Sequence, residues 1–288
     1  MNAPDETKRP AQESQFEIVE YAVEGRKNRL DLVVTEEPLE IRVVHGPADQ
    51  RKMRSVSITM RTPGHDQELA AGFLMSEQIL NSHEQINEFK TLGVDTEGQV
   101  TGNIVRVDVA PDVVLDLGRL QRHFFTTSSC GVCGKASLEA LEVQGLKPVT
   151  NDSFVLGSAE IKRLPDKLLS HQQTFNRTGG LHAAGLFDSN GQLLDSREDV
   201  GRHNAVDKLI GGRFLKGTSC LLEYGMIVSG RVSFEIMQKA LTAHLPMIVA
   251  VGAPSSLAVE MARQYNMTLI GFASPDRFNV YAGQARVQ

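Results

Sequence analysis

Residues 180–197, with the sequence GLHAAGLFDSNGQLLDSR, decide the fold. Two strand-like segments, 180–187 and 192–197, flank the dipeptide Asn190-Gly191. Both residues of this dipeptide accept positive φ, which a tight hairpin turn requires. The stretch therefore predicts an antiparallel β-hairpin.

Helices and strands alternate along the chain after this hairpin. Helices are expected at residues 202–215, 233–244 and 255–265, and the strands between them at residues 219–228, 247–251 and 268–273. Strands that alternate with helices form a parallel sheet with helices packed on its faces. A further helix is expected before the hairpin, at residues 165–175. Residues 151–288 are therefore predicted to form a C-terminal α/β domain.

The first half of the chain has short apolar-polar alternations, which are typical of half-buried antiparallel strands. Strands are expected at residues 16–23, 30–35, 38–44, 55–60 and 103–110. Asp66 can cap a helix that runs to about Leu80, and a weaker signal favours a second helix at residues 84–89. Residues 16–120 are predicted to form a smaller N-terminal α+β domain, preceded by a polar, disordered tail at residues 1–15.

The composition of the 288-residue chain excludes several classes of protein. Its hydrophobic fraction of 41% and charged fraction of 23% fit a globular protein. No apolar run approaches the roughly 20 residues that span a bilayer, and the polar N-terminus lacks the apolar stretch of a secretory signal. The net charge of -5 argues against a general nucleic-acid binder, which needs a broad basic surface. We therefore expect a cytoplasmic protein that binds neither membranes nor nucleic acid.

The chain has three cysteines, a small and odd number that does not suit a disulfide framework. Cys130 and Cys133 form a CxxC pair within SSCGVCGK, and a helix is expected to follow at residues 135–142. The thiolate is the reactive form of cysteine, and a helix N-terminus or a cation such as Lys135 lowers the pKa of a nearby thiol. We expect residues 121–150 to be a mobile loop and helix that present this pair for catalysis or metal binding.

The third cysteine, Cys220, lies in the apolar run Cys220-Leu221-Leu222. Such a run is typical of a strand that is buried on both faces. Cys220 is therefore predicted to be an inert core residue, with a role as a third metal ligand as the minor alternative.

Three loops follow the predicted parallel strands, at the edge of the sheet where open α/β proteins bind their ligands. Their sequences are SGRVS (229–233), GAPSS (252–256) and FASPDRFN (272–279). Free backbone amides and the guanidinium of Arg231 suit a phosphate, while Phe272 offers an aromatic face and Asp276 a carboxylate for a guanine edge. Each loop taken singly is an ordinary helix cap. Together they predict an anionic, nucleotide-like ligand.

Two neighbouring features have open interpretations. The charged segment DSREDVGRHN (195–204) either contributes Arg202, His203 or Asn204 to the same cleft or is a solvated loop that caps the next helix. His182 lies in an apolar strand, where a histidine is more often a buried residue with satisfied hydrogen bonds than a ligand or a proton carrier.

Six motifs follow one another in the order found in a known family. They are SSCGVCGK, GGLHAAGLF, DSREDVGRHNAVDKLIG, SGRVSFEIMQKA, VGAPSSLAVEMA and GFASPDRFNVY. With EPLEIR and RTPGHDQELAAGFLMSEQIL before them, they cover nearly everything after about Pro38. On these motifs the chain resembles the formate dehydrogenase accessory sulfurtransferases, the FdhD family.

The resemblance implies a cytoplasmic sulfur carrier that is generally a homodimer. Members of this family accept persulfide sulfur from a cysteine desulfurase and pass it to the bis-molybdopterin guanine dinucleotide cofactor, which formate dehydrogenase needs. The family places the persulfide on the first cysteine of the motif, here Cys130, whereas Cys133 could protect, release or resolve it. The cofactor-binding segment of the family maps onto Phe272, Ala273, Ser274, Pro275, Asp276 and Arg277. Contacts from Ser229, Arg231 and Ser255 follow instead from the chemistry of the loops.

The family is similar to the cytidine deaminase fold, so the resemblance also implies a mixed sheet with flanking helices. The deaminase reaction does not carry over to this chain. Zinc deaminases use an H-x-E element with P-C-x-x-C, whereas Ser129 precedes Cys130 here and His83 is adjacent to Glu84.

Two other functions remain open for the CxxC pair. A dithiol oxidoreductase would use Cys130 and Cys133 as a redox pair, but that class places its CxxC between a strand and a helix, and this pair follows a Ser/Thr-rich loop. A zinc-binding assembly protein would need four ligands, so histidines such as His123, His182 or His203 would have to join the two cysteines.

Overall fold

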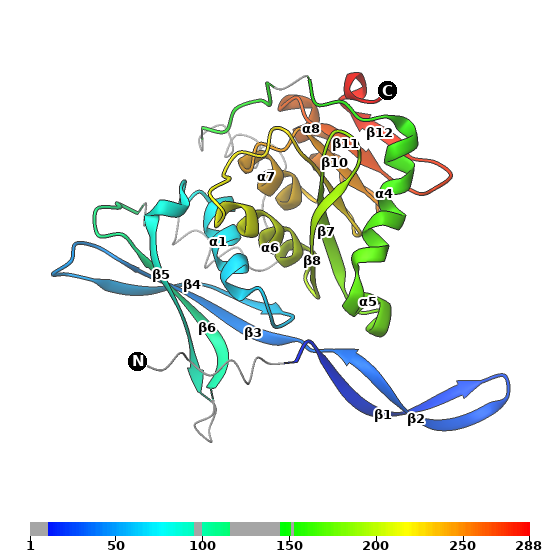
Figure 1. Cartoon of the computed structure of the whole chain (residues 1–288), viewed down its shortest axis with the longest axis horizontal. Coiled ribbons are helices and arrows are strands. Elements are labelled where there is room, and N and C mark those ends of the chain that lie inside the picture. Colours follow the sequence, from blue (N-terminus) through cyan, green and yellow to red (C-terminus); the bar gives the residue numbers. More distant parts are fainter. Residues whose placement is uncertain (1–10, 95–99, 116–144, 151–152) are drawn as a thin grey trace.

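The computed structural model describes residues 11–94, 100–115, 145–150 and 153–288 of the 288-residue chain. The predicted CxxC pair, His123 and the helix expected at residues 135–142 lie outside the described residues. The described strands form three sheets, of six, four and two strands (Figure 1). No helix in the described part of the chain is both long and apolar enough to cross a membrane.

The six-stranded sheet organises the C-terminal half. In spatial order its strands are β12 (Asn279–Ala282), β11 (Thr268–Gly271), β10 (Met247–Ala250), β9 (Gly225–Val228), β7 (His182–Phe187) and β8 (Leu193–Asp199). The strands β9, β10 and β11 run parallel, while β7, β8 and β12 pair antiparallel with their neighbours. Every residue of the three parallel strands is buried, because helices cover both faces of the sheet. The predicted mixed α/β fold is confirmed.

The helices divide between the two faces of this sheet. They are α6 (Arg202–Phe214), α7 (Phe234–Thr242) and α8 (Ser256–Gln264) on one face, and α4 (Ser158–His171), with α5 (Gln173–Thr178) after it, on the other. Side chains alternate along a strand, so Met226 and Val228 belong to the core under α6 and α7, whereas Ile227 belongs to the core under α4.

The N-terminal part contains a four-stranded sheet. Its spatial order is β4 (Lys52–Arg61), β3 (Glu37–His45), β6 (Val100–Val109) and β5 (Ile86–Val94). The pairs β3–β4 and β5–β6 are antiparallel, as expected, but the central pair β3–β6 is parallel. A helix, α1 (Asp66–Ser76), lies between this sheet and α6 (Figure 1).

Two helix predictions in this part need correction. Residues 84–89 are not a helix: the hydroxyl of Ser82 caps one 3-10 turn, η1 (His83–Gln85), and the chain then enters β5. The N-cap of α1 is His65, and Asp66 is the first helical residue, whose carboxylate accepts a hydrogen bond from Arg61 Nε at 3.0 Å. The same helix ends at Ser76, short of the expected Leu80.

Two predictions in the C-terminal half, a helix and the hairpin turn, also change. The range predicted as one helix, residues 165–175, spans two: α4 begins at Ser158, so Pro165 lies inside it, and ends at His171, and α5 begins at Gln173. The β7–β8 hairpin is confirmed, but Phe187 pairs with Leu193 and the loop between them has five residues, 188–192. Within it Gly191 has a φ of 68°, and Asp188 Oδ1 accepts hydrogen bonds from two later backbone amides, so the tight two-residue turn was wrong.

Within the range predicted as a strand, residues 219–228, only β9 is a strand in the structure. Cys220 lies before β9. The amide of Tyr224 donates to the carbonyl of Leu221 at 3.1 Å, so the apolar run folds as a turn rather than as a strand. Cys220 is therefore an exposed free thiol and not the core residue that the sequence predicts.

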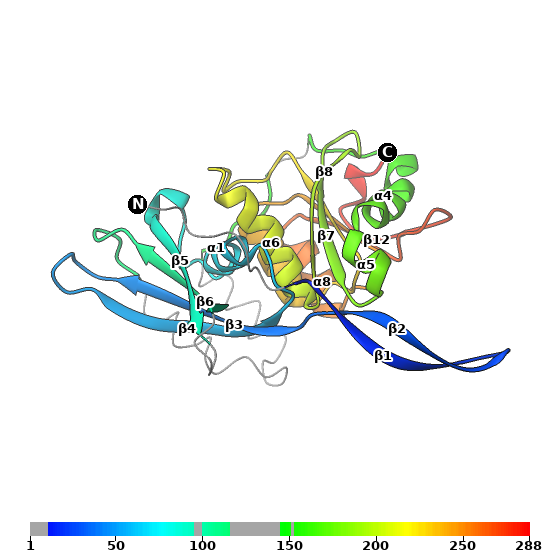
Figure 2. The ribbon, with the colours of Figure 1, turned by 60° about the horizontal axis from the view of Figure 1, so that its bottom comes forward.

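A two-stranded arm extends from the body of the molecule (Figure 2). It consists of β1 (Glu13–Ala22) and β2 (Gly25–Val34), which pair with each other along their whole length. The two strands expected here are confirmed, and both are longer than predicted. Residues 13–15, predicted to belong to a disordered tail, are part of β1. Exposed apolar side chains along the arm include Phe16, Tyr21 and Leu30.

The helices α1 and α6 are in backbone contact and join the two halves. A Cβ atom added to Gly72 would lie 1.8 Å from the carbonyl oxygen of Asp207, and one added to Gly211 would lie 1.9 Å from that of Glu68. Both positions therefore need glycine for the helices to approach this closely. One continuous core contains Leu69 of α1 together with Val206 of α6.

Candidate functional site

Five loops meet at one edge of the six-stranded sheet. The parallel strands β9, β10 and β11 end there, and the antiparallel pairing of β7 and β8 brings His182 and Asp199 to the same edge. The three predicted ligand loops are joined across this edge by backbone hydrogen bonds. The amide of Gly252 donates to the carbonyl of Gly230 at 3.2 Å, and the amide of Phe272 donates to that of Gly252 at 3.1 Å. Sequence reasoning placed these loops side by side correctly.

Serine hydroxyls bond the loops at 229–233 and 252–256 to β7 and α8, respectively. The hydroxyl of Ser229 accepts a hydrogen bond from the amide of Ala183 at 2.9 Å, which fixes this loop to β7. The hydroxyl of Ser255 accepts from the amide of Ala258 at 3.2 Å and so caps α8. A Cβ atom on Gly252 would lie 2.8 Å from the carbonyl of Gly230, so glycine is required for the two loops to touch.

The segment 272–277 turns back on itself and presents its charged side chains to solvent. The hydroxyl of Ser274 accepts from the amide of Arg277 at 3.2 Å, and Asp276 and Arg277 are exposed. Phe272 is 42% exposed and has a φ of 54°, a left-handed conformation that is uncommon for an aromatic residue. Ala273 is buried, so its side chain faces the core rather than a ligand. Pro275 is exposed on the same turn.

Arg202 and two histidines lie beside these loops. Arg202 is the first residue of α6, and its Nε atom is buried with no hydrogen-bond partner. A Cβ atom on Gly230 would lie 3.3 Å from His182 Nδ1 and 3.8 Å from Arg202 Cδ, so both side chains lie beside the backbone of Gly230. His203 Nε2 lies 3.3 Å from the hydroxyl of Ser233.

Both histidines are held in the neutral form at neutral pH. Burial, and then the positive charges of Arg202 and Arg231, lower the pKa of His182. Burial, and then the charges of Arg202 and Lys239, lower the pKa of His203 to about 4. The guanidinium groups therefore supply the positive charge of this edge, and the imidazoles act there as neutral hydrogen-bonding groups.

Asn204 was a candidate for the cleft, but its side chain points toward the N-terminal part of the molecule. Its Nδ2 donates to the carbonyl of Met60 at 2.7 Å and to Asp199 Oδ1 at 3.0 Å. Asp199 in turn pairs with the buried Lys208 at 2.7 Å, and Lys208 donates to the carbonyl of Thr62. This buried group of hydrogen-bonded residues connects α6 to the N-terminal part, and so it helps to hold α6 in place at the sheet edge. Sequence reasoning missed Lys208, and its place four residues after Asn204 in a helix was the available signal.

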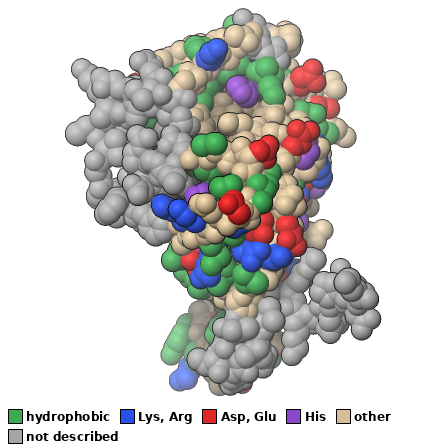
Figure 3. Space-filling view, turned by 90° about the vertical axis from the view of Figure 1, so that its left-hand side faces the viewer, with side chains coloured by type: hydrophobic (Ala, Val, Ile, Leu, Met, Phe, Trp, Pro, Cys, Tyr) green, Lys and Arg blue, Asp and Glu red, His purple; other side chains and the backbone are tan. Residues whose placement is uncertain are grey.

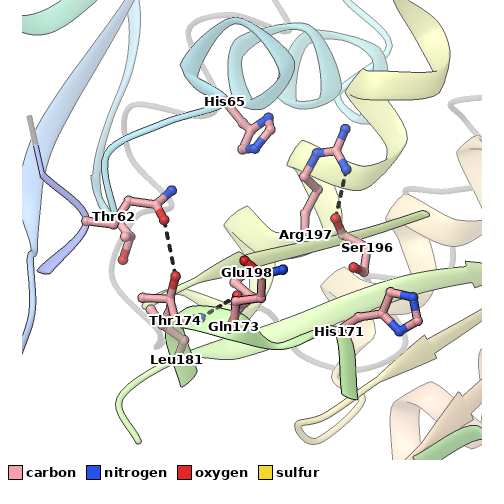
Figure 4. Close-up of a pocket in the computed structure, with 10 residues that line it drawn as sticks. Thr62, His65, His171, Gln173, Thr174, Leu181, Ser196, Arg197 and Glu198 are labelled. Atoms are coloured by element: carbon pink, nitrogen blue, oxygen red, sulfur yellow. Dashed lines mark hydrogen bonds between the residues drawn. The ribbon is translucent and has the colours of Figure 1, made fainter. Parts of the chain in front are cut away.

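A separate cavity of about 280 Å³ lies along the outer edge of β8 (Figure 4). Its charged groups already have partners. Arg197 Nη2 donates to Glu68 at 2.9 Å, and Glu198 accepts from the amides of Thr174 at 3.1 Å and Phe175 at 2.8 Å. Burial would raise the pKa of Glu68, but hydrogen bonds from Arg197 and His65 lower it to about 2. Hydrogen bonds already hold Arg197, Glu68 and Glu198, so the sheet edge is the better candidate.

The exclusion of nucleic-acid binding and the open zinc hypothesis can both be compared with the described residues. On the face in Figure 3, acidic and basic side chains are interspersed with hydrophobic ones, and the coloured residues form no broad basic patch. Among the described residues, no group of three or more His, Cys, Asp or Glu side chains could hold a metal ion. The zinc hypothesis depends on Cys130 and Cys133, which the structure does not describe.

Comparison with known proteins gives consistent results over most of the chain. Residues 34–288 match the FdhD/NarQ family. Proteins named sulfur carrier protein FdhD include one from Streptomyces avermitilis, 47% identical over 266 residues with 90% of each chain covered, and one from Thermoplasma volcanium, 42% identical over 260 residues with 89% of each covered. The crystal structure of a candidate formate dehydrogenase accessory protein from Desulfotalea psychrophila superposes with a TM-score of 0.71 at 25% identity, covering 96% of this chain and all of that one.

Proposed function

The chain belongs to the FdhD/NarQ family, and on this basis we propose that it is a sulfur carrier in the maturation of formate dehydrogenase. The observation that carries the proposal is the extended similarity to proteins named as sulfur carriers. In this proposal the protein works in the cytoplasm as a homodimer. Its partners are a cysteine desulfurase and a formate dehydrogenase.

Sulfur would be loaded on Cys130 by thiol exchange. The Cys130 thiolate attacks the terminal sulfur of the persulfide on the desulfurase, a new S–S bond forms, and the desulfurase cysteine leaves as a thiolate. No external oxidant or reductant is needed, because one S–S bond replaces another. Attack of Cys133 on Cys130 would release the terminal sulfur as sulfide and leave a disulfide. Protection of the persulfide is the alternative role for Cys133.

The acceptor would be the bis-molybdopterin guanine dinucleotide cofactor, with its guanine end at the sheet edge. The exposed Phe272, Asp276 and Arg277 support a guanine site, since they offer an aromatic face, a carboxylate and a cation on one turn. Ser229 and Arg231 lie on the loop after β9, and the Gly252 loop after β10 lies between that loop and Phe272. Ser255 already caps α8, so its hydroxyl could serve the ligand only as an additional donor.

Loading can be measured by intact mass after incubation with a cysteine desulfurase and cysteine. We expect a gain of one sulfur atom that a reductant removes, and loss of that gain in Cys130→Ala. Cys220→Ser is the matched control, because Cys220 is an exposed thiol outside the motif. A chain that gains no sulfur and instead reduces a protein disulfide would be a dithiol oxidoreductase, and tightly bound zinc without sulfur would favour the assembly protein.

The guanine site can be measured separately by titration with a guanine nucleotide. Arg277→Ala should weaken binding, whereas Arg163→Ala should not, because Arg163 pairs with Glu160 on α4. Equal binding by both variants would remove Arg277 from the site.

A further inference from the structure

We propose that the end of the β3–β4 hairpin, residues 45–54, is a docking site for an acidic segment of another protein. Carboxylates of that segment would bind His45, Lys52 and Arg54. These residues belong to the four-stranded sheet and are separate in sequence from both the cysteine motif and the ligand loops. The docking site is therefore additional to the proposed function.

His45 contributes a buried nitrogen that lacks a partner. It is the last residue of β3 and is only 8% exposed, and its Nε2 atom forms no hydrogen bond with any described residue. Burial, and then three neighbouring cations of which Arg54 acts most strongly, lower the pKa of His45, so the imidazole is neutral at pH 7. In the tautomer that carries its hydrogen on Nε2, this atom is a donor. A carboxylate oxygen would supply the missing acceptor.

Two exposed cations lie on the same face of the hairpin as His45. In the antiparallel register of β3 and β4, Lys52 is directly opposite His45, and Arg54 is opposite Val43, two residues earlier. Residues directly opposite each other, or two apart along one strand, have side chains on the same face. Lys52 and Arg54 are exposed, and neither forms a hydrogen bond or an ion pair with any described residue.

These unpaired cations differ from the other arginines of the four-stranded sheet. Away from the hairpin end, carboxylates hold the arginine side chains: Arg42 pairs with Glu40 at 2.6 Å, Arg61 with Asp66 at 3.0 Å and Arg106 with Asp108 at 2.6 Å. The sheet thus supplies its own counterions there. At the hairpin end the described residues supply none for Lys52 and Arg54, so their charge is available to a carboxylate from outside.

Arg51 adds a third positive charge at the same place. Its guanidinium donates to three main-chain carbonyls, including that of Gly46 at 2.6 Å. Carbonyl groups hold the side chain in position but do not neutralise its charge. Residues 45–54 therefore contain three cations and one carboxylate, that of Asp49, in a chain whose net charge is -5. The end of the hairpin is locally positive.

The exposed position of the hairpin end favours a protein segment over other anions. It projects from the body of the molecule on the side opposite the β1–β2 arm (Figure 1, Figure 2). Small carboxylates usually bind in concave pockets, and nucleic acid needs a broad basic surface, whereas this site is a projecting end with three cations. Met53, between Lys52 and Arg54 in sequence, is 53% exposed and offers apolar surface to a polypeptide.

Fluorescence anisotropy with a labelled, end-blocked hexaglutamate peptide tests the site on the full chain. We expect binding that weakens as salt is added, because exposed charges make the contacts. Lys52→Glu/Arg54→Glu should weaken it about tenfold or more. Arg26→Glu/Lys27→Glu is the matched control, because it makes the same change of charge at the end of the β1–β2 hairpin, where both cations are exposed. Thermal unfolding followed by circular dichroism establishes that both variants are folded.

Proton NMR of the His45 imidazole is a second readout. Its signals are those that disappear in His45→Gln. Carboxylates beside the ring favour its protonated form, so the pKa of His45 should rise when the peptide is bound. The signals of the exposed His171 serve as the internal control and should not change.

Several outcomes would overturn the docking site. They are no binding of the peptide by the wild type, an equal loss of affinity in the two double variants, and an unchanged pKa of His45 in the presence of bound peptide. Tighter binding of a thymidine oligonucleotide of equal charge, with the same dependence on Lys52 and Arg54, would assign the site to nucleic acid instead. Competition by succinate at the same concentration as the peptide would assign it to a small carboxylate.

Discussion

At the scale of single residues, His203 shows how the sheet edge controls protonation. Burial and two nearby cations lower its pKa to about 4, below the usual value near 6.5. As pH falls, the unfolded chain therefore takes up the proton first. The stability that comes from a neutral His203 is complete above about pH 6.5, and it is lost as pH falls toward 4.

We predict that His203→Gln makes stability less sensitive to acid. Between pH 7 and pH 5 its free energy of unfolding should fall by less than that of the wild type. The effect is smaller than the full pKa shift implies, because the His203 side chain is 37% exposed and partly screened by solvent. Urea unfolding at the two pH values measures this difference in the free energy of unfolding. His171→Gln is the control, because His171 is exposed. Equal acid sensitivity in wild type and His203→Gln would contradict the prediction.

Cys220 gives a second prediction at this scale. The variant Cys130→Ala/Cys133→Ala should still react with one equivalent of a thiol reagent in the native state, since Cys220 is exposed. Absorbance of the released thiolate measures this stoichiometry. Reaction only after denaturation would mean that the thiol is covered. The exposure of Cys220 could not be predicted from the sequence, because the apolar residues around it are compatible with both a buried strand and a turn.

At the scale of elements, the contact between α1 and α6 determines how the two halves fit. We predict that Gly211→Ala lowers the free energy of unfolding by about 1–3 kcal/mol, because the new methyl group meets the backbone of Glu68, which cannot move aside. Gly212→Ala is the control on the same helix. Its methyl group would meet the ends of Arg197 and Glu68 side chains at 3.2 Å and 3.3 Å, which can shift. Chemical unfolding that shows equal losses for the two variants would contradict the close contact.

The elements also show what could be predicted from the sequence. The helix-strand order after β7 was predictable, because apolar runs, glycines and caps there all agree with one parallel arrangement. Residues 84–89 were misassigned because pairing with β6 decides their conformation, and that partner is distant in sequence. The three ligand loops were found from their chemistry. Arg202 remained one of several open choices, since its unpartnered Nε is a property of the surrounding packing.

At the scale of the whole molecule, the two halves share one core. Residues of α1, β3 and β6 belong to the same cluster as residues of α6, α7 and β9. Buried polar contacts cross the same boundary, including Lys208 to Thr62 and Asn204 to Met60. The site edge is therefore supported by residues from the N-terminal half.

We predict that a fragment of residues 153–288 does not fold cooperatively. It would expose the apolar face of α6 and leave Lys208 without the Thr62 carbonyl. Circular dichroism during thermal unfolding measures this, and a fragment of residues 35–288 serves as the control. That control lacks only the arm and the residues before it, so its melting temperature should stay close to that of the full chain. A sharp transition in the fragment of residues 153–288 would contradict the shared core.

The arm has a consequence for hydrodynamics. Each of its strands has 10 residues, which extend about 33 Å at about 3.3 Å per residue. A compact chain of 288 residues has a radius of gyration of about 19 Å, so the arm is long relative to the body that carries it. A single molecule should therefore have a larger Stokes radius than globular standards of equal mass. On a calibrated gel-filtration column it would elute early and resemble an oligomer, so the number of subunits has to come from light scattering or sedimentation equilibrium.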